Sequence, residues 1–474
     1  MKKFRFLPVV ISLLLASLAC SAVPGLSPAE PTTQPMPTEL SASPTTAPTL
    51  PATAEPTASP TLPPTATSVP TDTPVPPTAT AEPTATIQVT PSAKQLEVFQ
   101  EIWSTVKENY LYPNFNGLDW NAIGDEYRAR VQGGLTDEAF YMAMGEMVAR
   151  LNDDHSAYLS PEDAAKEDAE YAGQNQYVGI GVLSAPLEDK KKATVLLVFP
   201  GSPAEAAGIK AHDSLLAADG QSLFDENGAR ISLLRGLPGT QVNVTVQSPG
   251  EEPRTIPITR QQISGPMPVP YTVLTTPQGK RVGYIFLISF MDRNIGPQFE
   301  AALQAMTAEG PLDGLVIDGR FNGGGSTEVA AEVFSMLTDG TLGYFVWRDT
   351  RQPLEVRGRD INGSQNVPLV VLVGDGSASY GEVFPGVLRD QGRAYIIGTT
   401  TDGNVEVLSQ FSFADGSRAW IATQTFRPTN NPDVNWEVTG IVPDMEVPAE
   451  WDEVTLETDP AVLAALLFFD MPRP

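Results

Sequence analysis

Two glycine-rich turns hold the residues of this sequence best suited to chemistry. The first spans residues 319–325, and the second, 374–379, carries Ser377 and Ser379. The uncharged, β-branched run 367–373 predicts a strand buried on both faces, and the small residues after it predict a tight turn into a helix. A serine in such a turn can attack a carbonyl carbon, because the unpaired N–H groups at the start of the helix stabilise the developing oxyanion. The alternative is a serine that acts only as a helix N-cap.

The strands that lead into these turns should lie side by side. Residues 312–318 form an apolar run before the first turn, and a helix is expected over 327–337. Two strand-turn-helix units in one α/β layer run parallel, so both turns should meet at the same carboxyl edge of the sheet. Glycine at that edge lets the backbone come close to a reacting carbonyl group.

Four motifs resemble those of the tail-specific (C-terminal processing) serine protease family. The resemblance implies an α/β protein with an N-terminal helical segment, a β-rich PDZ domain and an α/β catalytic domain with a central, crotonase-like sheet. It also implies a serine-type endopeptidase, without cofactor or metal, that acts on unfolded or tailed proteins and peptides. The motifs are Asp153–Pro161, Gly319–Gly325, Ser377–Val383 and Gly440–Asp444, in the family's order.

The family pattern makes Ser379, rather than Ser377, the nucleophile. The same pattern makes the N–H groups of Tyr380 and Gly324 the oxyanion donors. A serine hydroxyl is a poor nucleophile until a neighbouring base takes its proton.

The base is where this sequence departs from the family. Most members use a lysine in a turn after the serine, but Asn404 occupies that place and no lysine follows Lys280. An asparagine cannot accept a proton, so the usual Ser-Lys pair is excluded. In one interpretation His155 is the base, as in the branch that includes the tricorn core protease, and Glu437 or Glu406 orients it. In the other the site is inactive and the protein binds peptides without cutting them.

Residues 176–263 resemble a PDZ domain. The turn at Gly179, Ile180 and Gly181 would then bind the terminal carboxylate of a peptide through backbone N–H groups while the peptide adds as a β-strand. The alternative is a PDZ fold that serves only as a lid or spacer.

Residues 1–20 predict a secretory signal peptide, because basic residues precede an apolar run too short for a membrane span. Cys20, the one cysteine in the chain, follows a sequence that resembles a lipoprotein processing site. The protein would then be extracytoplasmic in the cell envelope, with a lipid anchor as its link to the membrane. The alternative is a secreted protein with a spare thiol. Residues 21–92 are rich in Pro and Thr and predict a disordered linker.

Composition sets further limits on function. The 474 residues carry a net charge of −27, which argues against nucleic acid and anionic membrane surfaces as partners. Only two histidines and one cysteine are present, so no metal site is expected. The sequence does not indicate an oligomeric state. The remaining segments are a helical segment at 93–170, the catalytic domain at 266–450 and a tail with a short helix at 451–474.

Overall fold

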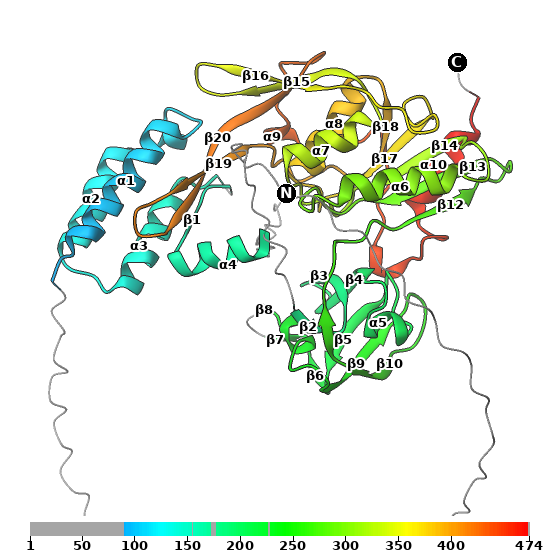
Figure 1. The fold of residues 1–474 in the computed structure, drawn as a ribbon, viewed down its shortest axis with the longest axis horizontal. Helices are drawn as coiled ribbons and strands as arrows, with labels where there is room; N and C mark the ends of the chain where they lie inside the picture. The colour runs from blue at the N-terminus through cyan, green and yellow to red at the C-terminus, as the bar shows by residue number, and fades with distance from the viewer. Residues whose placement is uncertain (1–89, 154, 172–176, 226–227, 473–474) are drawn as a thin grey trace, which may run out of the picture. The chain divides into compact units, whose positions relative to one another are not determined.

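A computed structural model describes residues 90–153, 155–171, 177–225 and 228–472 (Figure 1). The predicted signal segment with Cys20, and the linker as far as residue 89, lie outside these ranges. Within them, no helix combines the length and apolarity needed to cross a membrane.

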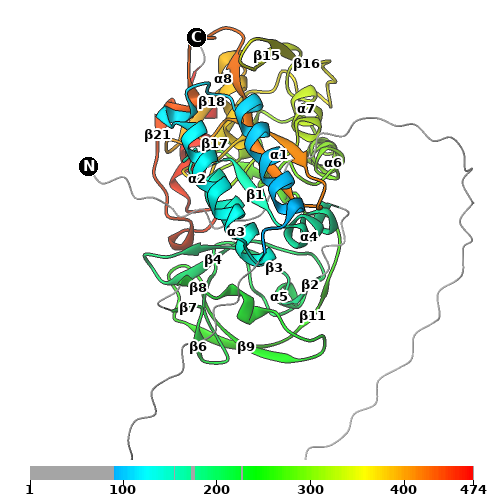
Figure 2. The ribbon, with the colours of Figure 1, turned by 90° about the vertical axis from the view of Figure 1, so that its left-hand side faces the viewer.

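The N-terminal segment is helical, as expected for residues 93–170, and its described residues form four α-helices. Side chains of Ser92, Asp119 and Thr136 cap three successive helices by accepting hydrogen bonds from first-turn N–H groups. Figure 2 shows the first two helices running side by side. Their apolar faces enclose a core that includes Phe99 and Trp120. The helices are α1 (Ala93–Asn109), α2 (Trp120–Gln132), α3 (Asp137–Ala149) and α4 (Pro161–Tyr171).

A strand joins this helical segment to the catalytic domain. Strand β1 (Ala157–Leu159) pairs antiparallel with β20 (Arg418–Pro428). Side chains of Ile421 and Ala422 from β20 complete the core of the helical segment. The sheet runs β1-β20-β15-β16, and β19 also pairs with β20. Its other strands are β15 (Gly340–Val346), β16 (Arg351–Val356) and β19 (Val407–Ser412).

The β-rich domain has the expected PDZ fold. Its main sheet runs β10-β9-β5-β4-β3, with β6 (Gln221–Ser222) beside β5, and encloses a core of small aliphatic side chains. Two short strands, β2 (Tyr177–Gly179) and β11 (Gln261–Ile263), form a separate ribbon. The remaining elements are β3 (Val182–Leu187), β4 (Lys192–Val198), α5 (Pro203–Ala206), β5 (Ser214–Ala218), β7 (Phe224–Asp225), β8 (Gly228–Ala229), β9 (Gln241–Gln247) and β10 (Arg254–Thr259).

The catalytic domain is built on a largely parallel sheet in the order β12-β13-β14-β17-β18-β21. Strands β14 and β17 are direct parallel neighbours, which confirms that the two glycine-rich turns leave the same edge of the sheet. Only β12, at one edge, runs antiparallel. The strands are β12 (Tyr271–Thr275), β13 (Arg281–Phe286), β14 (Gly314–Asp318), β17 (Leu369–Val373), β18 (Ala394–Gly398) and β21 (Met445–Glu446).

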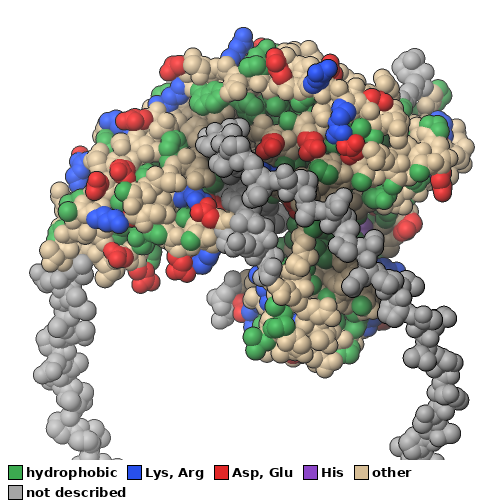
Figure 3. Space-filling view, viewed as in Figure 1, with side chains coloured by type: hydrophobic (Ala, Val, Ile, Leu, Met, Phe, Trp, Pro, Cys, Tyr) green, Lys and Arg blue, Asp and Glu red, His purple; other side chains and the backbone are tan. Residues whose placement is uncertain are grey.

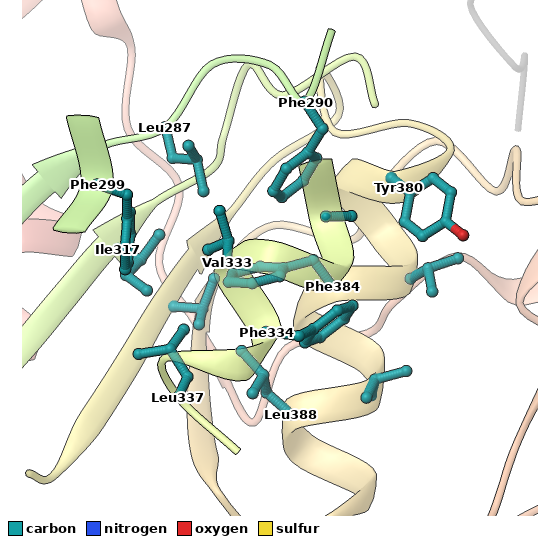
Figure 4. Close-up of a cluster of buried hydrophobic side chains, with 14 of the residues drawn as sticks. Leu287, Phe290, Phe299, Ile317, Val333, Phe334, Leu337, Tyr380, Phe384 and Leu388 are labelled. Atoms are coloured by element: carbon teal, nitrogen blue, oxygen red, sulfur yellow. The ribbon is translucent and has the colours of Figure 1, made fainter. Parts of the chain in front are cut away.

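Alternate strand residues point to opposite faces, and helices cover both. One face packs against three helices, and there the Phe384 ring contacts both Phe290 and Phe334 (Figure 4). The other face packs against the C-terminal helix through residues such as Val316 and Val370. The first three helices are α6 (Ile295–Thr307), α7 (Thr327–Ser335) and α8 (Tyr380–Asp390), and the last is α10 (Pro460–Asp470).

Acidic and basic side chains are intermixed over the face of the molecule shown in Figure 3. The excess of carboxylates therefore does not form one continuous acidic patch on this face. A mixed charged surface is the ordinary solvated exterior of a soluble domain.

Candidate active site

The turn after β17 holds Ser379 in a strained conformation. Its φ is 54° and its ψ is −124°, a region that non-glycine residues rarely occupy. Such strain clusters at functional sites, where the surrounding structure imposes it. Ser377 is buried instead, where its hydroxyl donates to the Gly319 carbonyl at 2.8 Å and accepts from the Gly374 N–H at 3.1 Å. Ser377 therefore fixes the turn, and Ser379 stands at the start of helix α8.

The first glycine-rich turn lies directly against Ser379. Gly324 has a φ of +92°, and a Cβ atom placed on it would lie 2.9 Å from both the Ser379 Oγ and the Tyr380 nitrogen. The Tyr380 N–H has no hydrogen-bond acceptor among the residues that the structure describes. The Gly324 N–H already donates to the Asn322 Oδ1 at 2.9 Å. The two predicted oxyanion donors are thus neighbours, and one of them is engaged within its own turn.

His155 lies in a buried carboxylate cluster. Its Nε2 is 2.8 Å from the Glu437 Oε1 and 3.8 Å from the Glu406 Oε2. The side chain of His155 is 4% exposed, that of Glu406 is 2% and that of Glu437 is 18%. Of the two predicted orienting acids, Glu437 makes the hydrogen bond. Since Glu437 occupies Nε2, Nδ1 is the ring nitrogen left to accept a proton.

The turn that contains Asn404 connects this cluster to the serine. The Ser379 N–H donates to the Asn404 carbonyl at 2.5 Å, which puts residue 404 beside the nucleophile. The next residue, Val405, donates its N–H to the Glu437 Oε2 at 2.8 Å. The opposite oxygen of Glu437 contacts His155, so the backbone of Ser379 is linked to the imidazole through the Asn404–Val405 peptide and Glu437. Among the described residues, no hydrogen bond joins the Ser379 Oγ directly to His155.

Glu382 fixes this turn through hydrogen bonds, a role that the sequence alone did not indicate. Its carboxylate accepts hydrogen bonds from the Thr401 hydroxyl, the Gly403 N–H at 2.8 Å and the Asn404 N–H at 2.6 Å. The Glu382 side chain comes from the first turn of α8, one turn after Ser379. The sequence signal for this role is an acidic residue among the apolar residues that begin a helix. An unpaired carboxylate is costly to bury there, so a partner is expected.

Electrostatics tune the titratable groups of the cluster. Burial lowers the pKa of His155, but the hydrogen bond and charge of Glu437, with the charges of Glu406 and Asp153, outweigh burial and raise it to about 9. Burial raises the pKa of Glu406 to about 7, although His155 and the Tyr112 hydroxyl oppose this rise. Burial likewise raises the pKa of Glu382 to about 7. Near neutral pH, therefore, His155 is predominantly the imidazolium ion.

His155, Glu406 and Glu437 are also the group of described residues whose ligand atoms could meet at a metal ion, all within 4.8 Å of one another. Two ligands of one tetrahedral zinc ion, each about 2.1 Å from it, are about 3.4 Å apart. The 2.8 Å separation of the His155 Nε2 and the Glu437 Oε1 is shorter and has the length of a hydrogen bond. The cluster is thus arranged as a hydrogen-bonded acid-base pair.

The predicted peptide-binding turn of the PDZ domain is well packed. Gly179, Ile180 and Gly181 are all buried. The carbonyl groups of Ile180 and Gly181 accept hydrogen bonds from the N–H groups of Ala204 and Phe199. The turn is therefore fixed by its own domain, and its backbone rather than its side chains is what a peptide could contact.

Comparison with known proteins agrees with these features. Family models match for peptidase family S41 over residues 281–447, the tricorn protease C1 domain over 91–149 and the PDZ domain over 178–256. A carboxyl-terminal-processing protease of a Picosynechococcus species is 33% identical over 381 residues, covering 78% of this chain and 88% of the relative. The chain belongs to the C-terminal processing proteases of peptidase family S41. As a member of that family it is a serine-type endopeptidase.

Other S41 relatives extend the comparison. A chloroplastic C-terminal processing peptidase of Tetradesmus obliquus is 30% identical over 371 residues, covering 74% of this chain and 77% of the relative. The solved structure of a photosystem II D1 C-terminal processing protease superposes with a TM-score of 0.55 at 27% identity, over 79% of this chain and 99% of that one. An S41 protease fold from Bacteroides fragilis superposes with a TM-score of 0.53 at 18% identity, over 78% of this chain and 97% of that one.

Proposed function

We propose that this S41 peptidase uses Ser379 as nucleophile and His155 as general base, with Glu437 orienting His155. The observation that carries the proposal is the 2.8 Å contact between the His155 Nε2 and Glu437, joined to the Ser379 turn through Val405 and Asn404. A carboxylate on one ring nitrogen fixes the tautomer and stabilises the imidazolium that forms when the other nitrogen takes a proton.

In the proposed reaction the Ser379 Oγ attacks the substrate carbonyl carbon while its proton moves to His155. The oxyanion of the tetrahedral intermediate accepts a hydrogen bond from the Tyr380 N–H, and from the Gly324 N–H once that group leaves Asn322. Collapse of the intermediate breaks the C–N bond, and His155 gives its proton to the leaving amine. Water then attacks the acyl-enzyme by the same route and releases the second product and the free serine.

Two observations favour a second candidate function, a peptide-binding protein with little catalysis at neutral pH. Asn404 lies beside Ser379 where the family lysine is expected, and it cannot act as a base. The charges around His155 also raise its pKa to about 9, so only a small fraction of the imidazole is unprotonated at pH 7.

Substrates are proposed to be proteins or peptides captured by their C-terminal tails on the PDZ domain. Strand β3 ends the sheet order, and among the described residues it pairs with β4 alone, so its other edge can accept an added peptide strand. The backbone at Gly179–Gly181 precedes β3 and would receive the terminal carboxylate. The basic and apolar N-terminus and Cys20 support export and lipid anchoring, with the protease held outside the cytoplasm.

The function is tested with the full chain and an unstructured peptide carrying an apolar C-terminal tail. We expect cleavage that increases from pH 7 to pH 9.5 and is abolished by Ser379→Ala. A fluorophosphonate probe should label Ser379 and leave Ser377 unlabelled when the adduct is located by mass spectrometry. Equal cleavage by Ser379→Ala would remove Ser379 from the mechanism. Specific binding of the tail without turnover at any pH would establish the peptide-binding function instead.

A further inference from the structure

A pocket of about 440 Å³ lies between the end of helix α1 and the sheet that contains β15 and β20. Trp347 and Tyr112 supply aromatic walls, and Arg348 and Arg427 supply two positive charges. This volume suits an amino-acid side chain with its neighbouring backbone. The sequence alone did not indicate a functional role for these two aromatic and two basic residues.

The two guanidinium groups are held in place mainly by neutral oxygen atoms. Arg348 donates from Nε to the Tyr110 carbonyl at 2.6 Å and from Nη1 to the Glu108 carbonyl at 3.2 Å, at the C-terminal end of α1. Arg427 donates from Nη1 to the side-chain oxygens of Thr425 and Asn435, each at 3.1 Å. Within the described ranges, no carboxylate oxygen lies within 4.0 Å of either group. The Nη1 and Nη2 atoms of Arg348 also donate to the Lys107 carbonyl, at 3.4 and 3.5 Å, so all three of its guanidinium nitrogens are engaged. The Nε and Nη2 atoms of Arg427 make no described hydrogen bond. A fixed arginine with free donors and no acidic partner is prepared to bind an anion bidentately, and here that residue is Arg427.

The pocket shares its walls with the catalytic cluster. The Tyr112 hydroxyl donates to the Glu406 Oε1. Asn435 precedes helix α9 (Trp436–Thr439), which carries Glu437. A ligand in this pocket would therefore lie beside the groups that set the charge of His155, rather than on a remote surface.

The charge of the pocket is opposite to that of the protein. The two arginines face one acidic lining residue, Asp349, which is solvent-exposed. The chain as a whole carries a net charge of −27. A local positive site on an acidic protein can bind an anion that the remaining surface repels. Such a site therefore selects peptides that carry a carboxylate at the position facing it.

We infer that this pocket is a substrate subsite that binds a carboxylate, supplied either by an Asp or Glu side chain near the scissile bond or by the C-terminus of the peptide. The inference rests on the proposed peptidase function. The aromatic walls would contact the aliphatic part of the residue, while Arg427 pairs with its carboxylate and Arg348 contributes a second positive charge.

The test compares peptide pairs on the full chain with Ser379→Ala, which reports binding by fluorescence anisotropy without turnover. One pair places Glu or Gln in the middle of a C-terminally amidated peptide. The other carries a free or amidated C-terminus and no acidic side chain. We expect about tenfold tighter binding of the acidic member of one pair, the magnitude of one charge-assisted hydrogen bond. The pair whose preference is lost in Arg427→Gln identifies the source of the carboxylate that the pocket binds.

Three further variants assign the preference to the pocket. Arg427→Gln should reduce it to about twofold or less, and Arg351→Gln should leave it unchanged, because Arg351 is exposed and stacks over Tyr344 outside the pocket. Asp349→Asn should strengthen it about two- to threefold by removing the opposing charge. Asp349 is exposed and makes no described hydrogen bond, so this variant keeps the test valid if Arg427→Gln is unstable.

Several results would overturn the inference. These are equal binding of both members in both pairs, or a preference that survives Arg427→Gln and does not respond to Asp349→Asn. A surviving preference for a free C-terminus would assign the carboxylate to the PDZ domain. If carboxylate selectivity depends on Arg427 but the wild-type chain, with Ser379 intact, never cleaves peptide, the pocket is still a carboxylate site and the proposed catalysis is rejected.

Discussion

Replacing Glu437 by Gln should change the pH at which the enzyme becomes active. Only the unprotonated imidazole of His155 can take the Ser379 proton, and the hydrogen bond and charge of Glu437 favour the protonated form. Removing that charge while keeping the side-chain shape therefore lowers the pKa of His155, and the acid limb of the rate profile moves to lower pH.

The size of the shift follows from the contact distances. At an effective dielectric constant of 20, opposite unit charges 4 Å apart interact by about 4 kcal/mol, and one pKa unit corresponds to about 1.36 kcal/mol. Glu406, 3.8 Å from the same nitrogen, retains part of the field, and the Gln oxygen can still accept a hydrogen bond. We therefore expect the pKa of His155 to fall by about two units, from about 9 toward 7.

The assay is kcat/KM for a quenched fluorescent peptide between pH 5.5 and 10 at constant ionic strength. Wild type should gain rate about tenfold per pH unit and level off near pH 9, whereas Glu437→Gln should level off near pH 7. The variant's plateau should be lower, because Gln cannot stabilise the imidazolium as a carboxylate does. Glu406→Gln is the matched control, since its longer contact with His155 predicts a smaller shift.

Glu437 does not control the protonation of His155 if wild type and Glu437→Gln share one apparent pKa. A wild-type plateau already reached below pH 7 would refute the reasoning, because the carboxylates would then not control His155. A group other than His155 would have to be the base if His155→Ala kept full activity.

Three further predictions concern the same site and its anchor. Gly324→Ala should lower kcat/KM at least a hundredfold while the fold is retained. The alanine Cβ would lie 2.6 Å from the Ser379 Cβ, and a φ of +92° strains alanine. Wild-type rates in this variant would refute the close approach of Gly324 to Ser379. Glu382→Ala should lower the free energy of unfolding, measured in urea, by about 3 kcal/mol by leaving the buried donors of Thr401, Gly403 and Asn404 unpaired; an unchanged midpoint would show that water replaces the carboxylate. Cys20→Ser should release the protein from the membrane fraction, and identical fractionation of both forms would leave only an ordinary export signal.

The glycine-rich turns were predictable because local sequence determines them. A buried strand, small turn residues and a helix start follow one another in each unit, and β14 and β17 lie in parallel as that pattern requires. His155 could be proposed because a branch of the resembled family uses a histidine at this position, and the sequence holds only one other histidine, His212. The structure places His212 elsewhere, stacked on Trp451.

Other parts of the site depend on contacts between distant segments. The sequence does not distinguish Glu437 from Glu406 as the partner of His155. Only the folded chain shows that Glu437 makes the short contact. The role of Glu382 depends on a turn about twenty residues later, which periodicity cannot reveal. Strands β15 and β16 were not predicted. Gly340 and Gly343 interrupt the apolar pattern of β15, and β16 contains Pro353 and lies at a sheet edge.

The pairing of β1 with β20 has a consequence for the biosynthesis of a protease. His155 is separated from Glu437 by 282 residues, and β1, which follows His155 directly, has no ladder partner until β20 is made. A chain that is synthesised N-terminus first thus carries His155, the proposed base, long before the strand that positions it. Catalytic competence is delayed until almost the whole chain is available to fold. Folding in this order would delay digestion of the nascent chain, and of others emerging beside it, until synthesis is nearly complete.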